Sequence, residues 1–175
     1  MTTFDFGSGN VPAHRHVNGG GWVADTAKVT ETSFVGPNAR VFDNADIIGN
    51  SKISGNAQVF ENAWVNSGKI FGNAKVFGNT EISVGAQVFE NAEVSGLTGL
   101  YGHAKVYGYT KISDDVMIFG DKTCPVTGII EELRCFAQNK DITDINFLPV
   151  GEKLNKIADE LENLSIRYHT SKENT

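Results

Sequence analysis

The sequence contains few of the features that mark extracellular or membrane proteins. Its 175 residues include only two cysteines, Cys124 and Cys135, which do not form a Cys-x-x-Cys pair. So few cysteines favour a reduced, cytoplasmic protein over one held together by disulfides. No apolar run approaches the roughly 18 residues of a transmembrane helix, and the N-terminus lacks the charged and apolar regions of a signal peptide. We therefore expect a cytoplasmic protein with no membrane partner.

Positive charge is also scarce. The chain has 15 lysine and arginine residues against 21 aspartate and glutamate residues, which gives a net charge of −6. The basic residues are spread along the chain and do not form a cluster. Because nucleic-acid binding depends on a basic patch that contacts phosphates, we expect no nucleic-acid partner. The length fits one domain, with room for a small appended module.

The sequence does contain a six-residue repeat that covers more than half of it. Aliphatic residues recur at every sixth position, with a single one-residue deletion between Val65 and Ile70. They are Val23, Val29, Val35, Val41, Ile47, Ile53, Val59, Val65, Ile70, Val76, Ile82, Val88, Val94, Leu100, Val106, Ile112 and Ile118. A small residue, most often alanine, stands two positions before most of them, and asparagine often stands three positions after them.

A period of six indicates short strands and excludes a helix. Residues two apart share one side of a strand, so each small-x-aliphatic triplet places two side chains inward together, whereas a helix needs spacings of three and four. Asparagine tolerates left-handed backbone angles and bonds its own backbone, so we expect it to form the corners. A corner every six residues predicts an all-β solenoid with three strands per coil, a little over five coils and a height of about 24 Å.

This pattern of aliphatic-x-x-(Asn/Gly)-small-x resembles the hexapeptide-repeat family. The resemblance implies a left-handed parallel β-helix of about five triangular coils, and the handedness follows from the resemblance alone. Glycine here usually stands two positions after the aliphatic residue, as in Val76-Phe77-Gly78-Asn79, and not directly after it as in many enzymes of the family. The regular repeat and the segment Pro12–Ala27 are similar to uncharacterised hexapeptide-repeat proteins of bacteria and their phages. If a phage encodes the chain, the expected location is the host cytoplasm.

The repeat divides the chain into five segments. We expect an N-terminal cap at 1–22, the β-helix at 23–119, a C-terminal cap at 120–149 with a short helix at 129–138, an amphipathic helix at 150–168 and a disordered tail at 169–175. The caps are expected because each end of a β-helix leaves sheet edges open to pairing with another chain.

The 150–168 segment carries an apolar stripe with the spacing of a coiled coil. The stripe consists of Val150, Leu154, Ile157, Leu161, Leu164 and Tyr168. A helix this short is marginal alone, so it must pack on its own β-helix or on copies of itself. Members of the family are commonly homotrimers, and the resemblance therefore implies a homotrimer. The alternative is a monomer with the helix along one flank.

The residues that follow the aliphatic positions point outward, and several are aromatic. Hexad order places them in three columns: Phe42, Phe60 and Phe77; Phe71, Phe89 and Tyr107; and Tyr101 with Phe119. A soluble monomer seldom exposes so much contiguous apolar surface. Either the columns are buried in a trimer interface and beneath the C-terminal helix, or they form a docking surface for a partner or an aromatic-lined ligand pocket.

His103 is the candidate catalytic residue. It occupies a corner position that asparagine holds elsewhere, and enzymes of the resembled family, the hexapeptide acyltransferases, typically use one histidine as a general base. The repeats run here without the inserted loop that carries such a histidine in the family, and a structural corner histidine is the competing interpretation. His14 and His16 are weak candidates for metal ligands, because two ligands are too few for a zinc site unless other subunits supply copies.

Two functions follow from these observations. The first is a non-catalytic, trimeric β-helical scaffold of the phage type, which binds a host protein or a small ligand through its outer faces or subunit clefts and needs no cofactor. The second is an acyltransferase that uses acetyl-coenzyme A, with His103 as the general base. The chain carries no glycine-rich phosphate loop, nucleophile elbow or paired-carboxylate motif, and fold alone does not decide function. The uninterrupted repeat favours the scaffold.

Overall fold

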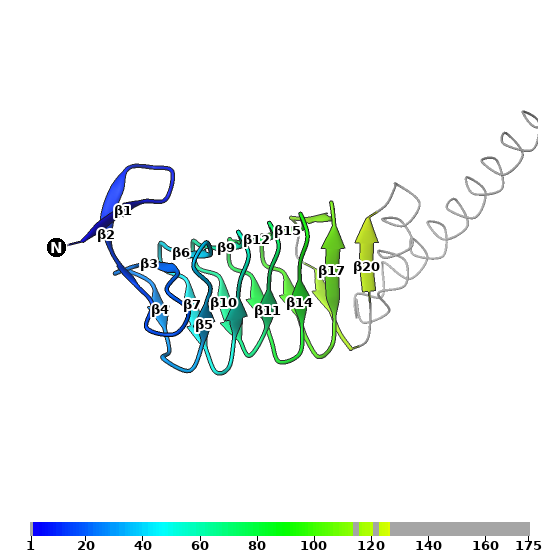
Figure 1. Ribbon diagram of the computed structural model, residues 1–175. Coiled ribbons are helices and arrows are strands. Elements are labelled where there is room, and N and C mark those ends of the chain that lie inside the picture. Colours follow the sequence, from blue (N-terminus) through cyan, green and yellow to red (C-terminus); the bar gives the residue numbers. More distant parts are fainter. Residues whose placement is uncertain (1, 114–115, 121–122, 127–175) are drawn as a thin grey trace, which may run out of the picture.

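The structure is a computed structural model that describes residues 2–113, 116–120 and 123–126. These residues form a parallel β-solenoid of about five turns with a triangular cross-section (Figure 1). The predicted all-β solenoid is confirmed, and the described residues contain no helix. The predicted helices at 129–138 and 150–168 and the tail at 169–175 lie outside the described residues. The left-handed sense of the coil stays a prediction.

Three sheets form the three sides of the prism. Sheet 1 contains β1 (Thr3–Asp5), β2 (Asn10–Arg15), β3 (Trp22–Ala24), β6 (Arg40–Val41), β9 (Gln58–Val59), β12 (Lys75–Val76), β15 (Glu93–Val94) and β18 (Lys111–Ile112). Sheet 2 contains β4 (Lys28–Val29), β7 (Asp46–Ile48), β10 (Trp64–Asn66), β13 (Glu81–Ile82), β16 (Gly99–Leu100) and β19 (Met117–Ile118). Sheet 3 contains β5 (Phe34–Val35), β8 (Lys52–Ile53), β11 (Lys69–Ile70), β14 (Gln87–Val88), β17 (Lys105–Gly108) and β20 (Thr123–Val126).

Equivalent strands of successive coils pair in parallel. Val41 pairs with Val59, eighteen residues further on, whereas Val59 pairs with Val76, only seventeen residues further on. The shorter step comes from the corner between β10 and β11, as the one-residue deletion in the repeat predicts. Gly68 occupies the small position of this tight corner, where an added Cβ would lie 2.7 Å from Cγ2 of Ile82. The deletion therefore shortens one corner and leaves the strand register intact.

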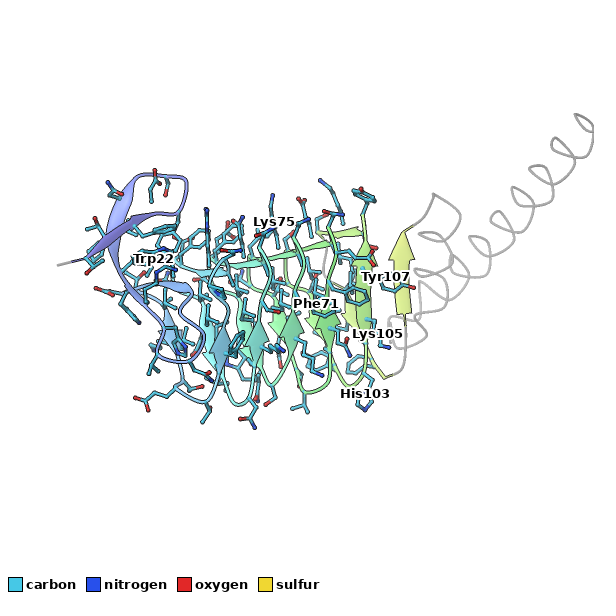
Figure 2. The ribbon with its side chains drawn as sticks, in the orientation of Figure 1. Trp22, Phe71, Lys75, His103, Lys105 and Tyr107 are labelled. Atoms are coloured by element: carbon cyan, nitrogen blue, oxygen red, sulfur yellow. The ribbon has the colours of Figure 1, made fainter. Side chains whose placement is uncertain are left out.

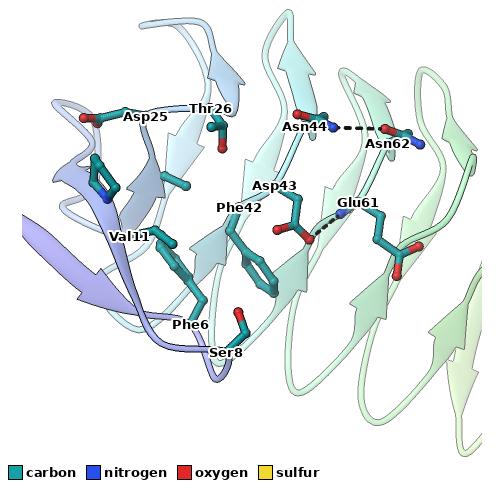
Figure 3. A pocket seen from close by; sticks show the side chains of 12 residues that line it. Phe6, Ser8, Val11, Asp25, Thr26, Phe42, Asp43, Asn44, Glu61 and Asn62 are labelled. Atoms are coloured by element: carbon teal, nitrogen blue, oxygen red, sulfur yellow. Dashed lines mark hydrogen bonds between the residues drawn. The ribbon is translucent and has the colours of Figure 1, made fainter.

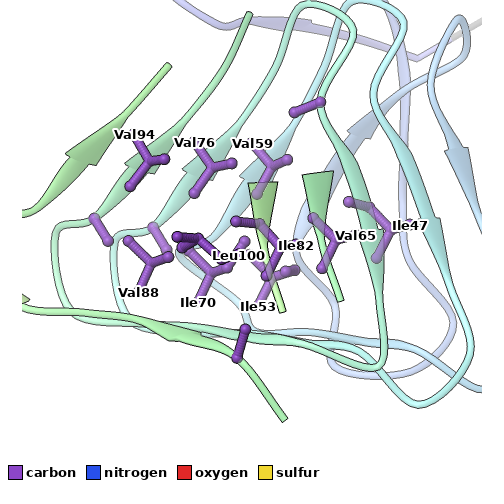
Figure 4. Packing of buried hydrophobic residues seen from close by; sticks show 14 of the residues in the cluster. Ile47, Ile53, Val59, Val65, Ile70, Val76, Ile82, Val88, Val94 and Leu100 are labelled. Atoms are coloured by element: carbon purple, nitrogen blue, oxygen red, sulfur yellow. The ribbon is translucent and has the colours of Figure 1, made fainter. Parts of the chain in front are cut away.

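The core is a stack of the repeating aliphatic side chains inside the prism (Figure 4). Between Val35 and Val106, these residues and the alanines before them are fully buried. Threonine or serine replaces alanine in several coils without leaving a buried hydroxyl unpaired. The hydroxyl of Thr80, for example, donates to the carbonyl of Phe77 at 2.6 Å. This position therefore requires a small side chain. A hydroxyl is tolerated there because it donates a hydrogen bond to a carbonyl of the corner.

At several corners the left-handed residue is the one before the asparagine, and both residues lie in the turn. Positive φ angles outside glycine occur at Asp43, Glu61, Ser67 and Glu90. The expectation that asparagine forms the corners is confirmed, but the left-handed angle that we gave as its reason belongs to the preceding residue. The acidic side chains hold this conformation because they bond to the next coil: the carboxylate of Glu61 accepts the N–H of Gly78 at 2.9 Å, and that of Glu90 accepts the N–H of Gly108 at 3.0 Å.

The asparagines form ladders along two edges of the prism. Nδ2 of Asn56 donates to Oδ1 of Asn73, and Nδ2 of Asn73 donates to Oδ1 of Asn91, at 3.0 Å in each case. Asn62 donates in the same way to Asn79 at 3.2 Å. The recurrence of asparagine is therefore explained by side-chain bonding between coils.

The residues before β3 cover part of the N-terminal end. Strands β1 and β2 form an antiparallel hairpin that extends sheet 1 through β3. The loop that follows β2 runs along the edge of β5, where Val35 donates its N–H to the carbonyl of Asn18 at 3.0 Å and accepts from the N–H of Gly21 at 2.8 Å. A Cβ added at Gly21 would clash with the carbonyl oxygen of Gly36. Glycine therefore permits this loop to close the edge of sheet 3.

Candidate functional site

On each side of the prism, the residues one position before the inward aliphatic residues form an outward column. On sheet 3 this column consists of Phe34, Lys52, Lys69, Gln87 and Lys105. We call it the lysine face. Each member stands one position before an inward aliphatic residue, so the alternation of the strand directs it to solvent. Figure 2 shows Lys105 and Tyr107 near each other on this sheet, and Phe71 on an earlier coil.

The lysines of this face are not neutralised by the described part of the chain. Lys52, Lys69 and Lys105 are exposed, and none of them forms an ion pair with a described carboxylate. The ammonium group of Lys52 lies 5.6 Å from the ring centroid of Phe34, which is a weak cation–π contact. The lysine face is therefore a positive surface on a protein whose net charge is negative.

Sheet 1 also carries outward cations, but its own residues engage them. Lys75 and Lys111 lie 3.4 and 3.0 Å from the two carboxylate oxygens of Glu93. The hydrogen bond from Lys111 is the main cause that lowers the pKa of Glu93. The guanidinium of Arg40 lies 5.3 Å from the ring centroid of Phe4. The two lysines of sheet 1 are therefore paired with a carboxylate, whereas the three lysines of sheet 3 are not paired with any described one.

An aromatic column borders the lysine face. Phe71, Phe89 and Tyr107 each stand two positions after a member of that face, so they project from the same side of sheet 3. The ring centroids of Phe71 and Phe89 are 4.8 Å apart with planes 2° apart, and those of Phe89 and Tyr107 are 4.9 Å apart at 9°. Each ring covers the flat surface of its neighbour. A partner can therefore reach the edges of these rings, but not the faces between them.

The other two predicted columns are stacked in the same way. Phe42, Phe60 and Phe77 stack at 4.8 Å, and Phe6 of the N-terminal hairpin extends this stack at 4.9 Å. Tyr101 and Phe119 stack at 4.9 Å. Phe119 is 37% exposed, and the seven other residues that we proposed for binding are half-buried. The columns stabilise the prism by stacking, and their role in partner binding stays a prediction.

Tyr101 is held in place by a carboxylate of sheet 2. Its hydroxyl donates to Glu81 at 2.8 Å, and burial together with this hydrogen bond raises the pKa of Tyr101 to about 12. An added Cβ at Gly99 would lie 2.5 Å from the Tyr101 ring, so glycine makes room for the ring against the strand. Tyr101 therefore has a structural role on this side of the prism.

His103 lies at the exposed corner between β16 and β17, at the border of the lysine face (Figure 2). The left-handed residue of this corner is Gly102, with φ 64. The imidazole covers Gly85 of the preceding coil, where an added Cβ would lie 2.8 Å from Nδ1. No described carboxylate forms an ion pair with it. His103 is therefore an accessible imidazole, two positions along the chain from both Tyr101 and Lys105.

In the structure, His14 and His16 have different hydrogen-bond partners. Nδ1 of His14 lies 2.8 Å from a carboxylate oxygen of Asp25 at the surface. His16 follows the end of β2, is 5% exposed, and accepts the N–H of Asn18 on Nδ1 at 3.2 Å. Within the described residues, no three histidine, cysteine, aspartate or glutamate side chains form a group suited to a metal ion.

A groove of about 810 Å³ lies between the N-terminal hairpin and the first coils (Figure 3). Phe6, Val11 and Phe42 contribute its apolar lining, and Asp43 and Glu61 contribute carboxylates. One oxygen of Asp43 accepts the N–H of Glu61 at 3.2 Å, so this side chain also joins two coils. Sequence reasoning missed this groove because nothing in the repeat indicates where a hairpin outside the repeat will pack.

Sequence reasoning also missed the lysine face, although its signal was present. Lys52, Lys69 and Lys105 each stand directly before an aliphatic residue of every third hexad, so hexad order alone assigns them to one side.

No family model matches the chain, and no curated protein matches it either. In the part of the chain that the structure describes, no helix is long and apolar enough to cross a membrane. The functional argument therefore depends on the geometry of the prism.

Proposed function

We propose that the protein is a non-catalytic, homotrimeric scaffold of the phage hexapeptide-repeat type, which binds a host protein or a small ligand through its outer faces. The lysine face is the observation that carries this proposal. Its three ammonium groups, which pair with no described carboxylate, stand on strands whose backbone is bonded from coil to coil, and the aromatic column borders them. Such a fixed array of like charge attracts an oppositely charged partner and orients it.

The trimer in this proposal is held by the predicted stripe Val150, Leu154, Ile157, Leu161, Leu164 and Tyr168, which lies outside the described residues. Association through the C-terminal segment would leave the sides of the prism available to a partner. Three copies of the lysine face would also bind a multivalent partner more tightly than one copy does.

Photo-crosslinking from the two outward glutamines tests this proposal. Gln87 lies in the middle of the lysine face, and Gln58 occupies the equivalent outward position on sheet 1; both are half-buried. We expect a photoreactive phenylalanine analogue at position 87 to crosslink a partner in host cells, and the same analogue at position 58 to give little product. Mass spectrometry then distinguishes another protein from a second copy of the chain. Equal crosslinking at both positions would contradict a specific role for the lysine face.

The alternative is an acyltransferase that uses acetyl-coenzyme A, with His103 as the general base. It is favoured by the accessible imidazole of His103 and by Lys105, which could pair with a phosphate of the cofactor. A rise in the melting temperature of the protein when coenzyme A is added would support the acyltransferase, if the rise disappears in His103→Asn. Asparagine is the matched replacement because Asn50 holds the same corner position three coils earlier. A panel of nucleotides serves as the control. If coenzyme A does not raise the melting temperature more than these nucleotides do, the scaffold is the better proposal.

A further inference from the structure

We infer, on the basis of the proposed function, that the partner of the lysine face presents an acidic amphipathic helix that lies along the prism axis. The inference starts from the heights of the outward side chains. Coils of a β-solenoid stack about 4.8 Å apart. The four residues Lys52, Lys69, Gln87 and Lys105 belong to successive coils. They therefore stand at about 0, 5, 10 and 14 Å along the axis.

A helix presents side chains at nearly the same heights. It rises about 1.5 Å per residue, so positions i, i+3, i+7 and i+10 share one face at about 0, 4.5, 10.5 and 15 Å. These heights differ from those of the lysine face by about 1 Å or less, which flexible lysine side chains can absorb. Carboxylates at i, i+3 and i+10 would face Lys52, Lys69 and Lys105, and a polar residue at i+7 would face Gln87.

The aromatic column predicts the second face of this helix. It borders the upper three coils and lies about 7 Å from the lysines across the sheet, which is the distance between alternate strand residues. Beside Lys52, in the lowest of the four coils, the same position is occupied by Ser54. Apolar residues at i+4, i+8 and i+11 would lie against the ring edges of Phe71, Phe89 and Tyr107. The helix is therefore acidic on one stripe and apolar on the adjacent one.

Two other kinds of partner fit less well. An extended strand repeats its side chains about every 7 Å, and the backbone of sheet 3 is already bonded between coils, as in the N–H of Lys69 to the carbonyl of Ala86 at 2.9 Å. Single-stranded nucleic acid binds by stacking its bases on open aromatic faces. Both faces of Phe89 are covered by Phe71 and Tyr107, so successive bases cannot stack between the rings of this column.

A fluorescent peptide with this pattern tests the inference on the full-length protein. The peptide carries glutamate at i, i+3 and i+10, glutamine at i+7 and leucine at i+4, i+8 and i+11, and its control has the same composition in scrambled order. We expect the patterned peptide to bind, and Lys69→Glu to weaken binding by about tenfold or more because an attraction becomes a repulsion. Lys28 is exposed on sheet 2, so Lys28→Glu changes the net charge equally and should leave the affinity for the peptide within about twofold.

Circular dichroism melts of both variants establish that they fold. Equal binding of the scrambled peptide, or equal weakening by both variants, would overturn the inference. Displacement of the peptide by an oligonucleotide at lower concentration would assign the face to nucleic acid and would also overturn it. If the patterned peptide fails to bind while position 87 still crosslinks a partner, the helix is wrong and the proposed function stands. If position 87 crosslinks nothing either, both fail.

Discussion

At the scale of the residue, the charged side chains of the corners and the strands differ in what they bond. Glu61 and Glu90 sit at corners and accept backbone N–H groups of the next coil, whereas Glu93 sits on a strand and accepts from two lysines. The sequence alone predicted the corners but assigned the left-handed angle to asparagine. Local propensity could not correct this, because the bonds that decide it join residues seventeen or eighteen positions apart.

The pH dependence of Glu93 follows from its lysine partners. Hydrogen bonds from Lys111 and Lys75 lower its pKa in the folded state below the ordinary 4.5 of the unfolded chain. Its contribution to stability is therefore complete above that ordinary pKa and is lost as the pH falls through the lowered value. We expect Glu93→Gln to reduce the free energy of unfolding at pH 7 by less than about 1 kcal/mol, because the pair is partly exposed.

Urea denaturation at a series of pH values measures this effect, and the difference between Glu93→Gln and the wild type should shrink below about pH 4. Glu31→Gln is the matched control, since Glu31 is exposed at a corner and the same substitution there should cost little. A Glu93→Gln difference that stays constant from pH 7 to pH 3 would contradict the assignment of the effect to the ion pair.

At the scale of the element, each aromatic column acts as a stack whose middle ring has two partners. Phe89 stacks on both Phe71 and Tyr107, whereas Phe71 stacks on Phe89 alone. An aromatic pair contributes about 0.5–1.5 kcal/mol beyond its buried area. We therefore expect Phe89→Ala to cost about 1 kcal/mol more in unfolding free energy than Phe71→Ala. Chemical denaturation of both variants measures this difference, and equal costs would show that the rings stabilise the prism singly and not as a stack.

The repeated elements were predictable from the sequence, and the unrepeated ones were not. The six-residue period predicted the strands and the inward aliphatic residues, because one spacing rule governs every coil. It did not predict that β1 and β2 form a hairpin on sheet 1, or that Phe6 extends the stack of Phe42. These contacts join a segment without periodicity to the prism, so no spacing rule applies to them.

At the scale of the whole molecule, net charge concealed the lysine face. The overall value of −6 is a sum over all 175 residues. The basic residues showed no cluster along the chain because Lys52 and Lys69 are seventeen residues apart, and Lys69 and Lys105 are thirty-six residues apart. Folding brings them onto one side only because a coil holds three hexads. The expectation of no nucleic-acid partner, which depended on that count, stays a prediction that the oligonucleotide competition also tests.

Two segments at the N-terminal end of the prism cover sheet edges that could otherwise pair with another copy of the chain. The hairpin covers sheet 1, and the loop before β3 occupies the edge of β5 through its bonds to Val35. On sheet 2, Lys28 and Thr30 donate their N–H groups to the next coil, so the N–H and carbonyl of Val29 point toward the end. Opening the edge of β5 would therefore leave two neighbouring sheet edges available for pairing with another chain.

Gly21→Ala is the substitution that should open this edge. The added Cβ would clash with the carbonyl of Gly36 and lie 2.5 Å from Cγ1 of Val35, whereas a Cβ at Gly20 would meet nothing within 4 Å. We expect Gly21→Ala to form species larger than the wild type as concentration rises, because unpaired edges template strand addition. Gly20→Ala should keep the wild-type size and cost only the strain of its φ of 74, about 1 kcal/mol. Sedimentation velocity measures both variants, and a Gly21→Ala protein that keeps the wild-type size at every concentration would mean that the hairpin alone protects this end.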